Sequence, residues 1–147
     1  MNNSITDLLR YGRKGEHGMK IGESDSDYCA CSHLLGILFH SRTQTHWWHL
    51  QTTSHALHVA LGEYYNTVPD LADRFAEAYM GCYGMRPKVN QEQYPLEDLV
   101  NPSIHFDMVQ EAMMKVRSHI EEKGDLLNIV DEIIELVHKV KYLLTLK

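Results

Sequence analysis

The stretch that decides the fold is residues 126–144, which read LLNIVDEIIELVHKVKYLL. Its apolar residues recur at alternating steps of four and three, the spacing of one face of an α-helix that packs in a bundle. They are Leu126, Val130, Ile133, Val137, Val140 and Leu144. We therefore predict a long amphipathic helix here, separated from the preceding helix by Gly124 and capped by Asp125.

Three further segments of the chain show helical spacing of their apolar residues. They run from a cap at Ser24 or Asp25 to about residue 50, from a cap at Thr53 or Ser54 to about residue 81, and over 103–123. Pro69 lies inside the second segment and removes one backbone hydrogen bond, so we expect a kinked helix, with a break at this proline as the alternative. Because no segment shows a strand signal, the fold is predicted to be all-α.

The connection between the second and third predicted helices is unusually long. Residues 82–102 contain Gly84 and three prolines and have no extended period, although one short helix is expected at 96–100. A connection of this length lets two helices of a four-helix bundle run parallel. We therefore expect residues 24–147 to form one four-helix bundle with a crossover between its second and third helices.

The first 23 residues differ in composition from the rest of the chain. They contain four glycines among balanced acidic and basic residues. This composition predicts a flexible N-terminal arm with a short helical turn at about 6–11.

Charge, hydropathy and cysteine content argue against several classes of protein. Fourteen Lys and Arg against twenty Asp and Glu give a net charge of −6, which argues against binding to DNA. No apolar run is long enough for a membrane span, and the N-terminus lacks the pattern of a signal peptide. The three cysteines form no paired framework, so we expect reduced thiols in a cytoplasmic protein.

Histidine is the over-represented residue type. The chain has ten, and His46, His49, His55 and His58 fall within thirteen residues. An antiparallel helical hairpin with its turn at 51–54 would bring His46 and His58 close together. Imidazole is a common ligand of borderline metals, so these residues are candidate metal ligands.

Asp73 and Glu77 form a second candidate pair on the same helix as His58. Their spacing of four places both on one helix face. They follow His58 by fifteen and nineteen residues, or roughly 22–28 Å along a helix, whereas metal ligands lie about 2 Å from the ion. The histidines and carboxylates could therefore share a metal only across two antiparallel copies of the chain. The alternative is that all four are solvated polar residues.

These residues resemble the ferroxidase signature of the Dps proteins, the mini-ferritins of the ferritin-like superfamily. The resemblance rests on His46-Trp47, on His58 twelve residues after His46, and on the Asp73-x-x-x-Glu77 step. Residues 124–139 are similar to the final helix of that family. The stretch 47–58 with Tyr64-Tyr65 also resembles small Dps-like proteins of tailed phages, so that the likeness spans about 28–146.

The resemblance implies a ferritin-like four-helix bundle that forms two-fold dimers, and in its fullest form a hollow dodecamer storing oxidised iron. His46 and His58 of one chain would bind iron together with Asp73 and Glu77 of its partner. The implied activity is that of a ferroxidase, in which peroxide or dioxygen oxidises Fe(II).

One position departs from the family pattern. The family places a carboxylate four residues after the second histidine, where this chain has Gly62, and Glu63 points about 100° away on the helix. Additional candidate ligands are His49, His55 and Glu63. The consequences left open are weaker iron binding, a preference for zinc, or a non-catalytic helical assembly protein that kept the fold without the chemistry. A third interpretation, a nucleotide pyrophosphatase, is suggested by the Glu132-x-x-Glu135 step, but this sequence lacks the second carboxylate cluster that such enzymes need.

Overall fold

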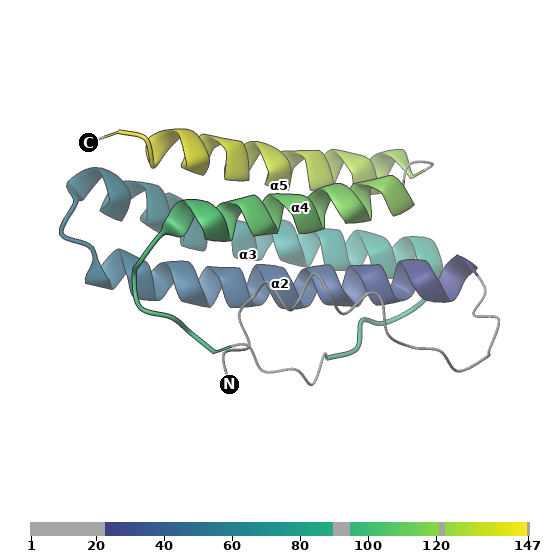
Figure 1. Ribbon diagram of the computed structural model, residues 1–147. Coiled ribbons are helices and arrows are strands. Elements are labelled where there is room, and N and C mark those ends of the chain that lie inside the picture. The colour runs from purple at the N-terminus through teal and green to yellow at the C-terminus, as the bar shows by residue number, and fades with distance from the viewer. Residues whose placement is uncertain (1–22, 90–94, 121–122, 147) are drawn as a thin grey trace.

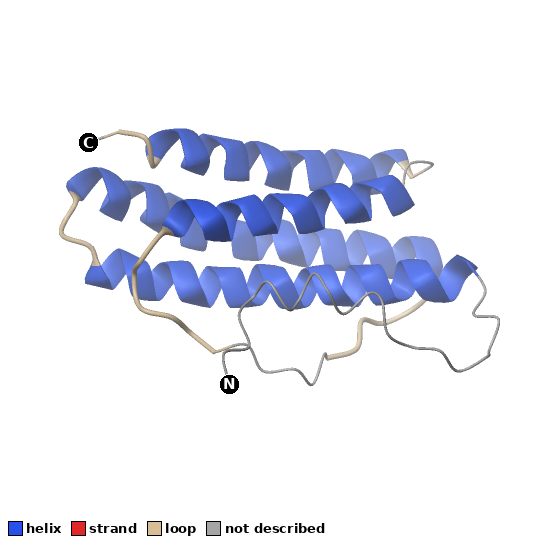
Figure 2. Ribbon diagram, viewed as in Figure 1, coloured by secondary structure: helices blue, strands red, loops and turns tan. Residues whose placement is uncertain are grey.

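The computed structural model describes residues 23–89, 95–120 and 123–146, and the surroundings of side chains from residue 31 onward. Four helices make up most of these residues, and the described part of the chain contains no strand (Figure 2). They are α2 (Glu23–Gln51), α3 (His55–Tyr83), α4 (Pro102–His119) and α5 (Gly124–Leu143). The predicted all-α class is confirmed for this part, while the predicted arm lies outside it apart from Glu23.

The four helices form two antiparallel hairpins that lie side by side. Figure 1 shows α2 and α3 as one hairpin and α4 and α5 as the other, with α3 and α4 running in the same direction. α2 packs against α3 and α4, and α5 packs against the same two helices. The expected crossover is therefore present, because the chain leaves α3 at one end of the bundle and enters α4 at the other.

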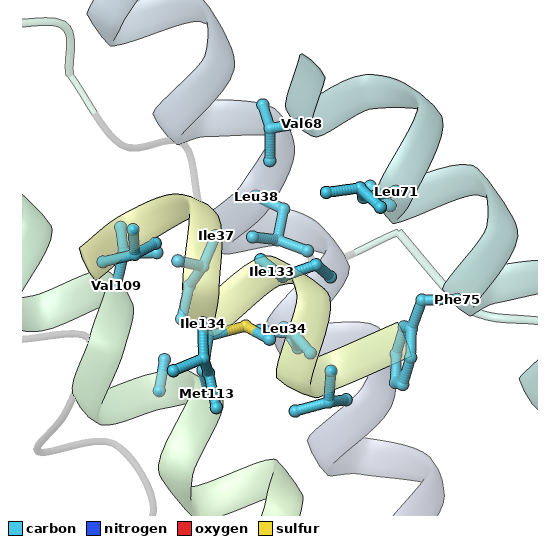
Figure 3. Close-up of a cluster of buried hydrophobic side chains, with 14 of the residues drawn as sticks. Leu34, Ile37, Leu38, Val68, Leu71, Phe75, Val109, Met113, Ile133 and Ile134 are labelled. Atoms are coloured by element: carbon cyan, nitrogen blue, oxygen red, sulfur yellow. The ribbon is translucent and has the colours of Figure 1, made fainter. Parts of the chain in front are cut away.

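The core lies along the shared axis of the four helices. Leu34 and Leu38 of α2 meet Phe75 of α3, Met113 of α4 and Ile133 of α5 in one buried cluster (Figure 3). Each such side chain contributes roughly 1.5–3 kcal/mol of burial free energy. Five of the six apolar residues predicted for the α5 face are fully buried, and Leu144 is half-buried.

The hairpin between α2 and α3 closes as the sequence predicted. Ser54 caps α3: its backbone is extended, and its hydroxyl accepts the backbone N–H of Leu57 at 3.3 Å. Pro69 lies inside α3, which continues without interruption from residue 55 to residue 83. The alternative of a break at Pro69 is therefore wrong.

Three helix boundaries differ from those predicted. α2 begins at Glu23, so Ser24 and Asp25 lie within the helix rather than before it. α4 ends at His119, four residues before the predicted end, because Ile120 leaves helical geometry with φ −113° and ψ 20°. Gly124 has no positive φ and is the first residue of α5, and Asp125 lies in the first turn.

The short helix predicted at 96–100 is also wrong. Residues 95–98 have no regular secondary structure and residues 99–100 form a bend. Their backbone groups bond to side chains of α2, including Gln44 and Gln51, instead of to one another. Among the helices described here, none is both long enough and apolar enough to cross a membrane.

Candidate functional site

The tip of the α2–α3 hairpin gathers the histidines that the sequence singled out. His46 and His49 lie near the carboxyl end of α2, and His58 lies in the first turn of α3. The short turn after Gln51 sets these two helix ends against each other (Figure 1). Residues that are nine positions apart in sequence thereby come into direct contact.

His49 and His58 bind each other across the hairpin, and we name this pair the histidine clasp. Nδ1 of His49 donates to the backbone oxygen of His58 at 2.8 Å, and Nδ1 of His58 donates to that of His49 at 2.9 Å. The two rings are stacked, with centroids 3.6 Å apart and an interplanar angle of 24°. Because each Nδ1 carries the donated proton, Nε2 is the nitrogen that each neutral ring keeps as an acceptor or metal ligand.

His46 lies next to the clasp and is held by an aromatic neighbour. Its ring stacks on Tyr65 of α3 with centroids 4.0 Å apart and planes 8° from parallel. The His49 ring meets Tyr65 edge-on at 5.1 Å and lies 6.3 Å from the His46 ring. The three histidines and Tyr65 thus form one ring cluster along the seam between α2 and α3.

Gly62 is the place where α3 makes room for this cluster. A Cβ atom at this position would lie 3.2 Å from Cε1 and 3.3 Å from Nδ1 of His49. The imidazole of His49 therefore packs directly on the glycine, and a longer side chain could enter only if His49 moved. Glycine at position 62 thus lets the His49 ring lie against the α3 backbone.

Asp73 and Glu77 are both exposed on α3 and lie far from the cluster along the helix axis. α3 is uninterrupted, so their separation from His58 is the roughly 22–28 Å expected of a continuous helix. Within the described residues of one chain, no three His, Cys, Asp or Glu side chains are placed to hold a metal ion. A single copy thus keeps the two candidate ligand pairs apart.

The additional candidate ligands fall at different places. His49 belongs to the clasp, whereas His55 is exposed at the first position of α3. The carboxylate of Glu63 pairs with Lys139 of α5 and so lies on the side of α3 that faces α5. Glu63 is therefore engaged with Lys139 and not with the histidines.

A buried polar chain inside the bundle was not anticipated from the sequence. Nε2 of His105 in α4 lies 3.0 Å from Oγ of Ser41 in α2, which is hydrogen-bonded to the hydroxyl of Tyr64 in α3 at 2.7 Å. Burial, with a smaller contribution from His40, lowers the pKa of His105 to about 3, so its imidazole is neutral at pH 7. Burial also raises the pKa of Tyr64.

One sequence signal could have revealed these buried hydrogen bonds. His105 stands four residues before Val109 on the apolar face of α4, which continues through Met113 and Val116. A polar residue on a core-facing position requires a partner inside the protein, because an unpaired buried polar group is costly.

Comparison with known proteins places the chain in a family. Residues 49–144, which is more than half of the chain, match a family described as a family of unknown function, DUF5856. The chain belongs to the DUF5856 family. The matched region of this DUF5856 protein begins at His49 of the clasp and contains all of α3, α4 and α5.

A bacteriophage protein is similar to this DUF5856 chain over most of its length. It is an uncharacterised 14.6 kDa protein from the mobD–ri intergenic region of Enterobacteria phage T4. The two are 27% identical over 116 residues, which cover 77% of this chain and 86% of the phage protein.

Proposed function

We propose that this DUF5856 protein binds a divalent transition metal ion on a ferritin-like bundle of the Dps type, at a site that two antiparallel copies complete. Two antiparallel hairpins joined by one long crossover are the arrangement expected of a ferritin-like bundle. The proposed ligands are His46 and His58 of one copy with Asp73 and Glu77 of the other.

The observation that carries the proposal is the orientation of His58. Its Nδ1 donates to a backbone carbonyl oxygen, as metal-ligating histidines commonly do, which leaves Nε2 for an ion. His46 lies in the same ring cluster, its ring plane held by Tyr65. Both imidazoles are therefore held in defined positions before any ion arrives.

Charge distribution along α3 supports pairing with a second copy. The histidines are gathered at the amino-terminal end of α3, and the exposed carboxylates Asp73 and Glu77 follow toward its carboxyl end. An antiparallel partner would place carboxylates opposite histidines at two equivalent sites. Imidazole with carboxylate suits iron, and zinc is the second candidate. With Fe(II) as substrate, the proposed activity is its oxidation by peroxide or dioxygen.

Complementation between two defective chains tests this proposal. His46→Asn removes a ligand from one half of each site, and Asp73→Asn removes one from the other half. Each variant alone should lose Zn(II) or anaerobic Fe(II) binding in equilibrium dialysis. An equal mixture, unfolded and refolded together, should regain about a quarter of the wild-type sites, since about half the dimers are mixed and each has one intact site.

The control for this experiment is Asp70→Asn, an exposed carboxylate on the same helix, which should bind metal like the wild type. A mixture that binds no more than its parents would refute a shared site. A wild-type protein that binds neither ion would refute the metal function itself.

The second candidate is a non-catalytic helical assembly protein, and the contact between Gly62 and His49 favours it. The His49 ring fills the space into which a side chain at position 62 would extend. Large apolar side chains are also exposed on this hairpin, including Trp47 at 52% and Leu50 at 66%. Dimers or larger assemblies in analytical ultracentrifugation, combined with no metal binding, would select this candidate.

A further inference from the structure

Residues 95–101, which we name the strap, lie along α2 and lead directly into α4. Side chains on one face of α2 hold the strap through its backbone. Gln44 donates from Nε2 to the oxygen of Glu97 at 2.7 Å and accepts the N–H of Glu97 at 2.8 Å. Trp48 donates from Nε1 to the same oxygen at 2.8 Å, and Gln51 accepts the N–H of Leu99 at 2.8 Å.

The strap buries little apolar surface of its own. Of residues 95–101, only Leu99 is half-buried and the others are exposed. Hydrogen bonds, more than apolar packing, therefore attach the strap to α2. Segments with few buried apolar contacts open locally more readily than the core does.

The strap bonds to Trp48, which is one of two buried rings in contact with each other. Trp48 is 4% exposed and meets the ring of His105 edge-on, with centroids 5.2 Å apart. His105 is the fourth residue of α4, and Asn101 at the end of the strap caps that helix by accepting the N–H of Ser103. Release of the strap would therefore remove the cap, fray the first turn of α4 and expose His105 to water.

The surroundings of His105 disfavour its protonated form. The titratable groups that face it are His40 of α2, whose ring centroid lies 6.3 Å away, and Tyr64 of α3, which it reaches through Ser41. His40 also donates from Nε2 to the backbone oxygen of Pro95 in the strap at 3.4 Å, and burial lowers its pKa as well. The charge of Glu97 acts on the pKa of His40 and not on that of His105. No carboxylate among the described residues accepts a hydrogen bond from the His105 ring to stabilise its positive charge.

We propose that the strap and the first turn of α4 form an acid-sensitive latch, in which protonation of His105 favours an open form that exposes Trp48. The closed form holds His105 neutral, since its pKa is lowered to about 3, whereas a hydrated imidazole titrates near 6.5. By linkage, the opening constant should rise roughly thirtyfold from pH 8 to pH 5.

Hydrogen exchange on the full chain tests the latch at single amides. The N–H groups of Glu97 and Leu99 report the strap, and that of Val137 reports the core. After correction for intrinsic rates, the two strap amides should exchange faster than Val137, with an opening constant that rises about thirtyfold between pH 8 and pH 5.

Two variants distinguish the attachment of the strap from the titration of His105. Gln51→Ala should raise opening at every pH and leave the thirtyfold ratio unchanged, because it removes an attachment of the strap but not the titrating group. His105→Gln should remove most of the pH dependence and leave the smaller part that comes from His40, whose pKa is also lowered by burial. The proposal is overturned if the ratio is flat in the wild type, if it persists undiminished in His105→Gln, or if the strap amides exchange as slowly as Val137.

Discussion

Replacing Gly62 by alanine should lower the free energy of unfolding of the wild-type chain and raise that of a chain in which His49 is already alanine. In a helix interior, Gly→Ala normally stabilises by about 1 kcal/mol. Here the new methyl group would lie 3.2 and 3.3 Å from two atoms of His49, closer than ordinary van der Waals contact. The imidazole would have to shift, which disturbs the ring stack and the two hydrogen bonds of the clasp.

The size of the effect follows from those two hydrogen bonds. At about 1 kcal/mol net for each, their loss outweighs the helix-propensity gain, so Gly62→Ala should lower the free energy of unfolding by about 1 kcal/mol. In a His49→Ala background the obstructing ring is gone, and the same substitution should raise that free energy by about 1 kcal/mol. The coupling between the two positions is then about 2 kcal/mol.

Urea unfolding of the four chains of this cycle provides the measurement. Gly81→Ala is the matched control, because Gly81 lies on the same helix and a Cβ atom there would meet nothing within 4 Å. It should stabilise by about 1 kcal/mol in both backgrounds. If Gly62→Ala stabilises equally with and without His49, the packing argument for this glycine is refuted.

Three further predictions concern stability. Burial lowers the pKa of His105 to about 3, so as the pH falls the unfolded chain takes up a proton at this imidazole before the folded chain does. The contribution of His105 to the free energy of unfolding is therefore complete above pH 6.5 and falls toward pH 3, by about 2 kcal/mol at pH 5. Urea unfolding of His105→Gln and of His105→Asn should both lack this loss. Ser54→Ala should cost about 1 kcal/mol as a lost cap, whereas its exposed neighbour Thr53→Ala should cost almost nothing in the same assay. Phe75→Ala empties a fully buried position and should cost about 3–5 kcal/mol, while Phe39→Ala, exposed by 54%, should show a small change in thermal unfolding.

The helices could be predicted because their causes are local. Apolar residues at helical spacing predicted all four, and a serine before α3 predicted its cap. The long proline-containing connection predicted that two helices run in the same direction, which Figure 1 shows for α3 and α4. Sequence reasoning failed at 96–100, because a short apolar segment can exchange its own helical bonds for bonds to another helix, here through Gln44 and Gln51.

The sequence by itself determined the four helices, the order in which they follow one another and the clustering of histidines at one hairpin. Only the tertiary structure decided which of these histidines touch, that the His49 ring packs on Gly62 and that His105 joins Ser41, 64 residues away, inside the core. The reason is physical: helical spacing acts between residues three or four positions apart, whereas ring stacking, close approach and burial depend on distances between helices. Those distances exist only once the bundle has packed.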